Sequence, residues 1–314
     1  MFYRLCNLVL GNGDLLLSPY LPDEIVDVQI LRDLRLFQTP SHWFMEWHLP
    51  SGELWLSFAK VDGGYRLRFE KLADFFVSTD GQKITYQPLS SVPSNTIRHL
   101  ILDQIIPLVI NLKGGEALHA SAMLTEEGAI AFAGNTGSGK STVAATFLQA
   151  GHPLLSDDCL ALEEKDGKIY AMPAYPGLRL WKDAADELFG EGRTHTAVAH
   201  YASKKQVDIE PKPETFCSEP KPLKRLYVIA DPSESNGRTD IVIDPLGQRD
   251  SFMALIEYAF RLDITDKNML TRQFRFFERV VSKVSVRKLT YPRDFKFLPA
   301  VREAILKDLE DLNI

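Results

Sequence analysis

Cysteine and excess positive charge are both scarce in this sequence of 314 residues. Its three cysteines, Cys6, Cys159 and Cys217, lie far apart and form no CxxC pair, which argues against a zinc site and against a disulfide scaffold. A reducing compartment is therefore expected. The net charge is -6, so no surplus of Lys and Arg is present to neutralise a nucleic-acid backbone.

Long apolar runs are also missing. The N-terminal apolar run is short and a polar turn follows it, which is not the pattern of a signal peptide. The longest candidate for a membrane helix, Ile101 to Leu112, is interrupted by Asp103, Gln104 and Pro107 and falls short of about 18 apolar residues. With 45% apolar and 25% charged residues, the composition is typical of a globular protein. We expect a cytoplasmic protein with no membrane and no nucleic-acid partner.

Turn residues organise the first 90 residues into short β-strands. Asp-Gly and Asn-Gly pairs favour tight hairpins, because Asn, Asp and Gly tolerate positive φ. The expected strands are Leu54–Lys60, Tyr65–Phe69, Phe75–Ser78 and Ile84–Gln87. A short helix is predicted within Asp23–Phe37. The polar stretch Leu89–Asn95 predicts a boundary between a β-rich N-terminal domain, 1–93, and a second domain, 94–314.

Helical and strand patterns alternate through the second domain, as in an α/β fold. Apolar positions at helical spacing predict a helix up to Leu112, bent at Pro107. The further strands expected are 118–124, 129–133, 153–155, 226–230 and 241–243, and the further helices are 141–150, 267–281 and 299–312. In the helix 267–281, the predicted core face is Leu270, Phe274, Phe277 and Val281. Arg272, Arg275 and Arg279 are assigned to a solvated face, with a peptide or subunit contact as the alternative.

The segment Gly134-Asn135-Thr136-Gly137-Ser138-Gly139-Lys140-Ser141-Thr142 contains the P-loop pattern GxxxxGK[ST]. Glycines let backbone N–H groups approach anionic oxygens, and the following helix offers its N-terminus to phosphates. Lys140 supplies a cation for the β- and γ-phosphates, and the Ser141 hydroxyl is suited to Mg²⁺. Because an apolar strand precedes the pattern and a helix follows it, a phosphate site is favoured over a flexible loop.

Two adjacent carboxylates, Asp157 and Asp158, follow Lys140 by 17 and 18 residues, at the end of an apolar strand. Beside a nucleotide, one can organise a metal and the other can accept a proton from an attacking hydroxyl. A solvated turn that caps a helix is the alternative. His119, on a neighbouring strand, reads by itself as an ordinary core or surface histidine.

Three segments together resemble HPr kinase/phosphorylase: Leu118–Ala122, the P-loop, and Gly151–Asp158. More closely, they are similar to the HPr-kinase-like serine kinases of bacterial peptide-biosynthesis clusters, such as those of lasso peptides. The resemblance covers residues 117–190, with looser similarity toward the C-terminus. It implies a P-loop kinase domain of the HPr kinase/PEP carboxykinase-like type. The N-terminal part does not resemble that of HPr kinase.

The resemblance implies roles for individual residues. Lys140 and Ser141 hold phosphates and Mg²⁺, Asp157 is the general base, and Asp158 supports the metal with Ser141. His119 lies near the transferred phosphoryl group, which makes it a catalytic candidate together with Asp157 and Lys140. Lys204 and Lys205, in the loop from Tyr201, are basic candidates for the phosphates, with a solvated loop as the alternative.

One family position departs from the pattern. A metal-binding glutamate of the family corresponds to Ala174, and Asp183 is the candidate substitute. This departure puts phosphorylase activity in particular doubt.

The expected activity is transfer of the γ-phosphoryl group of ATP, with Mg²⁺, to a serine hydroxyl. A lasso-peptide precursor is the leading acceptor. The alternatives are a small-molecule kinase acting on free serine or a metabolite, a kinase of HPr itself, and a nucleotide-gated protein that binds a leader peptide. The paired aspartates favour an enzyme, since a binding module needs only the P-loop. HPr kinase is hexameric, so by analogy a homo-oligomer is also considered.

Overall fold

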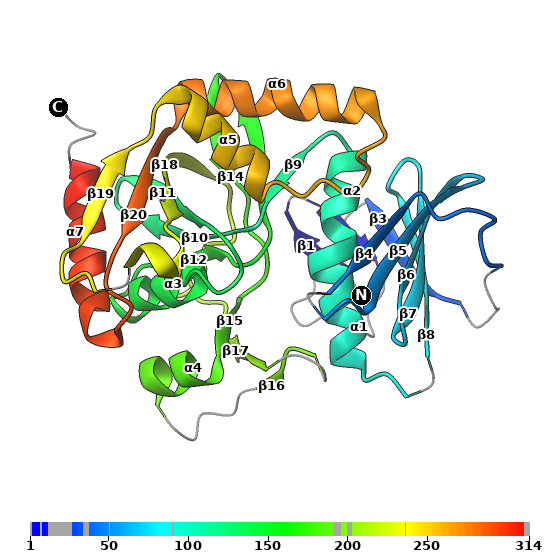
Figure 1. Cartoon of the computed structure of the whole chain (residues 1–314), viewed down its shortest axis with the longest axis horizontal. Coiled ribbons are helices and arrows are strands. Elements are labelled where there is room, and N and C mark those ends of the chain that lie inside the picture. The colour runs from blue at the N-terminus through cyan, green and yellow to red at the C-terminus, as the bar shows by residue number, and fades with distance from the viewer. Residues whose placement is uncertain are drawn as a thin grey trace. The chain divides into compact units, whose positions relative to one another are not determined.

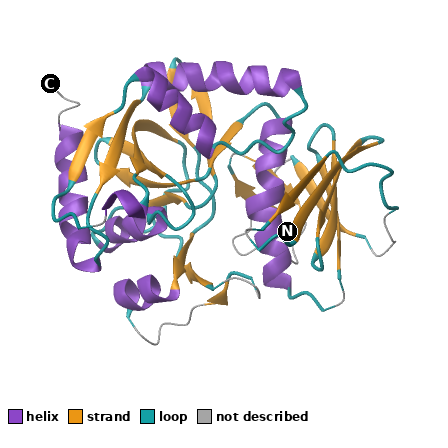
Figure 2. Cartoon of the chain, in the orientation of Figure 1, coloured by secondary structure: helices purple, strands orange, loops and turns teal. Residues whose placement is uncertain are grey.

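The computed structural model describes residues 2–6, 8–11, 27–33, 38–49, 51–89, 91–190, 196–199, 203–235 and 237–310. It is a mixed α/β protein, as predicted (Figure 2). The chain forms two compact units, one of residues 1–114 with 199–201 and the other of residues 115–198 with 202–314.

The first unit contains an eight-stranded sheet in the order β1-β2-β3-β8-β7-β6-β5-β4 (Figure 1). The four strands expected from the hairpin pattern are present as β5 (Leu54–Val61), β6 (Gly64–Phe69), β7 (Ala73–Ser78) and β8 (Lys83–Pro88). They form an antiparallel meander. The remaining strands are β1 (Phe2–Leu5), β2 (Leu8–Gly11), β3 (Val28–Arg32) and β4 (Met45–His48).

The helix predicted within Asp23–Phe37 is wrong where the structure describes it, because Val28–Arg32 forms strand β3. The rest of that prediction, apart from Asp27 and Asp33, lies outside the described residues. The burial of β3 alternates between Val28, Gln29 and Ile30, with the two apolar side chains buried and the glutamine exposed. Parallel pairing with β8 stabilises this segment as a strand. No turn residues next to it in the sequence indicated this pairing.

One long helical segment follows the sheet as α1 (Ser94–Leu100), a π-helical turn (Ile101–Ile105) and α2 (Ile106–Leu112). The irregular turn comes directly before Pro107, whose missing N–H cannot continue the α-helical ladder. A Cβ placed on Gly81, between β7 and β8, would lie 3.4 Å from side-chain atoms of Val109 and Leu112. The sequence assigned this helix to the second domain. In the structure, the contacts of this helix group it with the first unit. The prediction differed because helical periodicity reveals a buried face but not the domain that covers it.

A nine-stranded sheet forms the centre of the second unit, with β12-β10-β11-β18-β14-β13-β9 as its main path and β20 and β19 continuing from β18. The strands are β9 (Glu116–Leu118), β10 (Ala120–Thr125), β11 (Gly128–Ala133), β12 (Leu154–Ser156), β13 (Leu160–Lys165), β14 (Lys168–Ala171), β18 (Lys221–Ile229), β19 (Val242–Pro245) and β20 (Ser285–Thr290). A separate three-stranded sheet consists of β15 (Gly177–Trp181), β17 (Lys204–Asp208) and β16 (Thr196–Ala197).

The side chains of strand β11 point alternately into two hydrophobic cores, one on each face of the sheet. Ala129, Ala131 and Ala133 belong to one core, while Ile130 and Phe132 belong to the other. The first core includes residues of α5 (Gln248–Tyr258) and α6 (Lys267–Lys283), and the second includes residues of α3 (Lys140–Gln149), α4 (Lys182–Phe189) and α7 (Leu298–Glu310). Helices therefore cover both faces of this sheet, as Figure 1 shows for α6 and α3.

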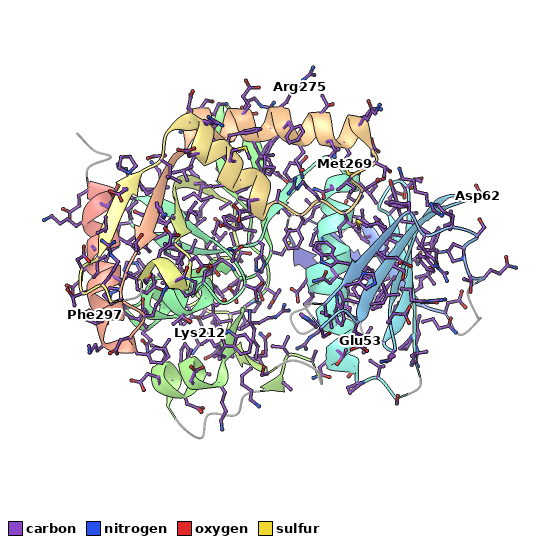
Figure 3. All side chains as sticks on the ribbon, in the orientation of Figure 1. Glu53, Asp62, Lys212, Met269, Arg275 and Phe297 are labelled. Atoms are coloured by element: carbon purple, nitrogen blue, oxygen red, sulfur yellow. The ribbon has the colours of Figure 1, made fainter. Side chains whose placement is uncertain are left out.

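The core face of α6 differs from its prediction. The buried residues are Met269, Gln273, Phe276, Phe277 and Val280, whereas Phe274 is 42% exposed. The buried face includes Gln273 because its amide donates to Glu116 Oε2 at 2.7 Å and to the Phe260 carbonyl at 3.3 Å. Figure 3 labels the buried Met269 and the exposed Arg275 on this helix. Arg272 and Arg279 are exposed but pair with Glu116 and Glu164 of the same unit.

Candidate active site

The loop between β11 and α3 has a backbone that only glycine adopts readily at its key positions. Gly139 has a φ of +97°, and a Cβ there would lie 2.7 Å from the hydroxyl of Tyr291. Gly134 has a φ of +153°, and a Cβ there would lie 2.6 Å from Ser138 Oγ. The loop packs this tightly against its surroundings because both positions lack side chains.

Helix α3 begins at Lys140, and no side chain of the described residues caps its first turn, which is the kind of helix N-terminus that can accept an anion. The Lys140 ammonium folds back to donate to the carbonyls of Gly134 at 2.8 Å and Asn135 at 3.0 Å. Burial lowers the pKa of Lys140 to about 8. Asn135, Thr136 and Gly137 are exposed at the tip of the loop, while the hydroxyl of Ser138 is buried and has no protein partner within the described residues.

Asp157 and Asp158 come directly after β12, which pairs with β10. Asp157 is fully buried and accepts three hydrogen bonds. Its Oδ1 accepts from Ser141 Oγ at 2.9 Å and from Ser121 Oγ at 2.5 Å, and its Oδ2 accepts from the Arg179 N–H at 2.8 Å. Burial, followed by the neighbouring Asp158 carboxylate, raises the pKa of Asp157 above its ordinary value. Asp157 thus joins the glycine-rich loop to β10 and β15.

Asp158 lies in the left-handed region with a φ of +63°, which aspartate tolerates better than most residues. Its side chain pairs with two cations: Arg179 Nη1 lies 3.5 Å from Oδ2 and Lys204 Nζ lies 3.9 Å from Oδ1. The side chain of Asp158 retains 10% exposure, whereas Asp157 has none. Of the two carboxylates, Asp158 is therefore the one with a solvent-facing side.

His119 lies at the break between β9 and β10, where the chain changes its pairing partner. Its backbone N–H donates to the Tyr258 carbonyl at 2.7 Å, and its Nδ1 lies 3.1 Å from the Asp158 carbonyl oxygen. Burial, and next the charge of Lys140, lower the pKa of His119 to about 4, so the ring is neutral at pH 7. A neutral ring whose Nδ1 carries the proton donates to that carbonyl and leaves Nε2 as an acceptor.

The structure thus brings together the residues that the sequence singled out: Lys140, Ser141, His119, Asp157 and Asp158. The pairing within the set differs from the expectation, because Ser141 contacts Asp157 rather than Asp158. The Ser141 hydroxyl and the carboxylate pair are hard oxygen donors, which fit Mg²⁺ when phosphate oxygens supply further ligands. Within the described part of the chain, no group of three or more His, Cys, Asp or Glu side chains could hold a metal.

Ala174 and Asp183, the two positions considered for a metal-binding carboxylate, make no contact with Asp157 or Asp158 within the described residues. Ala174 is buried and its N–H donates to the Leu155 carbonyl at 2.9 Å. Asp183 is exposed in the first turn of α4. The residue of this segment that contacts both aspartates is Arg179, through its backbone N–H and its side chain.

Sequence reasoning missed Arg179, Gln206 and Arg293. Arg179 is 3% exposed and opposes Gln206 across the β15–β17 ladder. Arg293 lies over the Tyr291 ring and donates to the carbonyls of Ser138 and Ala230, which ties the glycine-rich loop to the end of β18. The sequence feature that could have indicated a functional role for Arg179 is its position in an otherwise apolar strand. The segment expected as a loop from Tyr201 is a strand where it is described, since Lys204 and Lys205 begin β17, and Lys204 reaches Asp158. Tyr201 and Ala202 lie outside the described residues.

Comparisons with known proteins found no matching family model and no matching curated protein. Among solved structures, the chain is similar to the Hpr(Ser) kinase/phosphatase from Coxiella burnetii, at 12% sequence identity and a TM-score of 0.33. The match covers 63% of this chain and 94% of that one. Among the residues that the structure describes, no helix is both long and apolar enough to cross a membrane.

Proposed function

We propose that this chain is an ATP-dependent kinase that transfers the γ-phosphoryl group to a serine hydroxyl. The observation that carries the proposal is the 2.9 Å hydrogen bond from Ser141 to Asp157. It joins the first turn of a helix with open N–H groups to a buried pair of carboxylates. A phosphate site directly beside two acidic side chains is the arrangement that phosphoryl transfer to an alcohol requires.

Each residue then has a chemical role. Backbone N–H groups of the loop and the N-terminus of α3 bind the phosphate oxygens, and the Lys140 ammonium exchanges its carbonyl partners for phosphate. Ser141 and Asp157 would hold Mg²⁺. Mg²⁺ supplies charge that neutralises the phosphate oxygens. The acceptor hydroxyl is deprotonated by a carboxylate while the phosphoryl group passes to its oxygen, and ADP leaves.

We assign the role of general base, which accepts the proton of the acceptor hydroxyl, to Asp158. The sequence had indicated Asp157 for this role. A general base must reach the hydroxyl of its substrate. Asp157 is completely buried, and both of its oxygens already accept hydrogen bonds within the protein. The side chain of Asp158 is 10% exposed, and His119 binds its backbone carbonyl. His119 therefore serves as a positioning residue that stabilises the left-handed conformation of Asp158.

A small peptide with a serine near its end is the acceptor that we propose, on the resemblance of 117–190 to peptide-tailoring kinases. Strand β4 lies at one edge of the sheet of the first unit, and its Trp47 is 55% exposed. Such an edge can pair with an extended peptide through backbone hydrogen bonds. The aromatic residues behind it, such as Phe58 and Tyr65, are buried core.

Phosphoryl transfer is tested by incubating the protein with Mg²⁺ and ATP and one acceptor at a time. The acceptors are a synthetic peptide with a serine near its C-terminus, the same peptide with alanine, HPr, and free serine. Mass spectrometry then detects added phosphate. We expect transfer to the serine peptide alone, and none with Lys140→Ala. Transfer to HPr or free serine with none to the peptide would refute the peptide acceptor, and no transfer to any hydroxyl would refute the kinase.

A further inference from the structure

The three-stranded sheet presents a row of polar side chains to the carboxylates. In the β15–β17 ladder, Arg179 opposes Gln206 and Trp181 opposes Lys204. Because side chains two residues apart share a face, Arg179, Gln206 and Lys204 lie on one face of this sheet. Arg179 and Lys204 both reach Asp158, which shows that this face is directed at the site. Helix α3 also contacts β15.

Arg179 is held in place by neighbours that direct its guanidinium. Its plane lies over the Tyr175 ring, with Cζ 5.3 Å from the ring centre, and its Nε lies 3.4 Å from Gln206 Oε1. Gly177 leaves the room for this arrangement, because a Cβ there would lie 2.0 Å from Gln206 Nε2. The Arg179 side chain is 3% exposed, so packing against its neighbours limits how far the guanidinium can move.

Positive charge exceeds negative charge at this site. The cations include Lys140, Arg179 and Lys204 beside the aspartates and Arg293 on the glycine-rich loop, and the anions include Asp157 and Asp158. His119 adds no charge at pH 7, because burial lowers its pKa to about 4. A surplus of positive charge in a partly buried site favours the binding of a polyanion. Arginine suits phosphate especially well, because its planar fork can donate two parallel hydrogen bonds.

We propose that Arg179, supported by Lys204, is a second phosphate-binding cation of this site and fulfils the role that a second divalent metal ion would have. This inference rests on the proposed function and deepens it. On nucleotide binding, the guanidinium moves part of its interaction from Asp158 to an oxygen of the terminal phosphate. The same exchange leaves Asp158 available to accept the proton of the acceptor hydroxyl. Ser141 and Asp157 would hold one Mg²⁺, whose charge would complete the balance.

The first test counts metal ions in the wild-type protein. The protein is saturated with a non-hydrolysable ATP analogue and titrated with Mn²⁺, and bound Mn²⁺ is measured by electron paramagnetic resonance. We expect one Mn²⁺ per chain. Two bound ions per chain would overturn the proposal, and so would a failure of the analogue to bind. This count does not depend on turnover, so a chain that binds one ion but phosphorylates no acceptor would refute the kinase and leave the Arg179 site standing.

A second test measures the affinity for the ATP analogue by calorimetry with excess EDTA, where the protein's own cations must hold the phosphates. Arg179→Gln should weaken binding about tenfold or more, the scale of a lost charge-assisted contact, and Arg179→Lys should restore part of it. Arg302→Gln is the matched control, because Arg302 donates to the Thr146 carbonyl of the same helix α3 at 3.3 Å. Equal affinities for Arg179→Gln and wild type would overturn the proposal. If Arg179→Gln does not fold, the proposal is decided by the Mn²⁺ count and by Lys204→Gln. We expect Lys204→Gln to weaken binding of the ATP analogue in EDTA.

Discussion

Ser141 Oγ and Asp157 Oδ1 lie 2.9 Å apart, and this contact connects the first turn of α3 to the end of β12. Strands β11 and β12 both neighbour β10 in antiparallel pairing, so their C-terminal ends lie at the same edge of the sheet. The glycine-rich loop and the two aspartates follow those ends. The sheet order therefore places phosphate binding and acid–base chemistry side by side.

The two aspartates are expected to differ in what their loss removes. Asp158→Asn should lower kcat about a hundredfold or more, the usual scale for removing a general base, with nucleotide affinity retained. Asp157→Asn should raise the Mg²⁺ concentration needed for half-maximal rate, because Asp157 is the carboxylate bound to Ser141. Steady-state kinetics over a range of Mg²⁺ concentrations measure both effects. The opposite result, with turnover lost in Asp157→Asn and Mg²⁺ dependence changed in Asp158→Asn, would restore the assignment made from the sequence.

Nucleotide binding near pH 8 should take up a proton at Lys140. Burial lowers the pKa of this ammonium to about 8, and bound phosphates favour its charged form. With that pKa, about half a proton per site is taken up at pH 8 and about a tenth at pH 7. Calorimetry in buffers of different ionisation enthalpy measures the uptake. Lys140→Arg should remove it, since arginine stays charged. An undiminished uptake in that variant would show that another group binds the proton.

Gly139→Ala should weaken nucleotide binding, because its new Cβ would lie 2.7 Å from the Tyr291 hydroxyl and so displace the loop. Strain of about 1–3 kcal/mol corresponds to a loss of affinity between about fivefold and about 150-fold. Gly151→Ala is the matched control: its φ of +88° is similar, but nothing lies within 4 Å of the added carbon. Both variants should lose about 1–2 kcal/mol of stability from positive φ. Equal nucleotide affinities in the two variants would contradict the packing argument.

Glu116 should make the stability of the protein depend on pH. Burial raises its pKa from 4.5 to about 7 in spite of its contacts with Gln273 and Arg272. The folded state therefore holds a proton that the unfolded chain releases near pH 4.5, so this contribution is complete below pH 4.5 and is lost as the pH rises to 7. Relative to Glu116→Gln, the free energy of unfolding of the wild type should fall by up to about 3 kcal/mol across that range, at 1.36 kcal/mol for each pH unit. Urea unfolding at pH 5 and pH 8 measures the difference. A constant difference between the two proteins would show that Glu116 is ionised throughout.

Local patterns were sufficient for much of the fold. The hairpin strands β5 to β8, the strand–loop–helix around Lys140 and the helices α6 and α7 were predicted, because turn residues and periodicity act over a few neighbouring positions. On α6 the predicted core residue Phe277 is buried, but Phe274 is exposed, and the buried face also includes Gln273. The buried Gln273 donates to Glu116, which is 157 residues away in the chain, and to the Phe260 carbonyl. Strand β3 was missed for a similar reason, since its partner β8 lies far away in sequence.

The sequence by itself determined the chemistry at each position of the candidate site: a glycine-rich loop with Lys140 and Ser141, two adjacent aspartates, and His119. Only the tertiary structure decided their partners. The contact of Ser141 with Asp157 depends on the pairing of β11 and β12 with β10, and the approach of Arg179 and Lys204 depends on the register of β15 with β17. A one-residue shift in that register would turn Lys204 to the other face, so no local pattern could specify it. Residue type is fixed along the chain, whereas the charge balance at the site depends on contacts between segments distant in sequence.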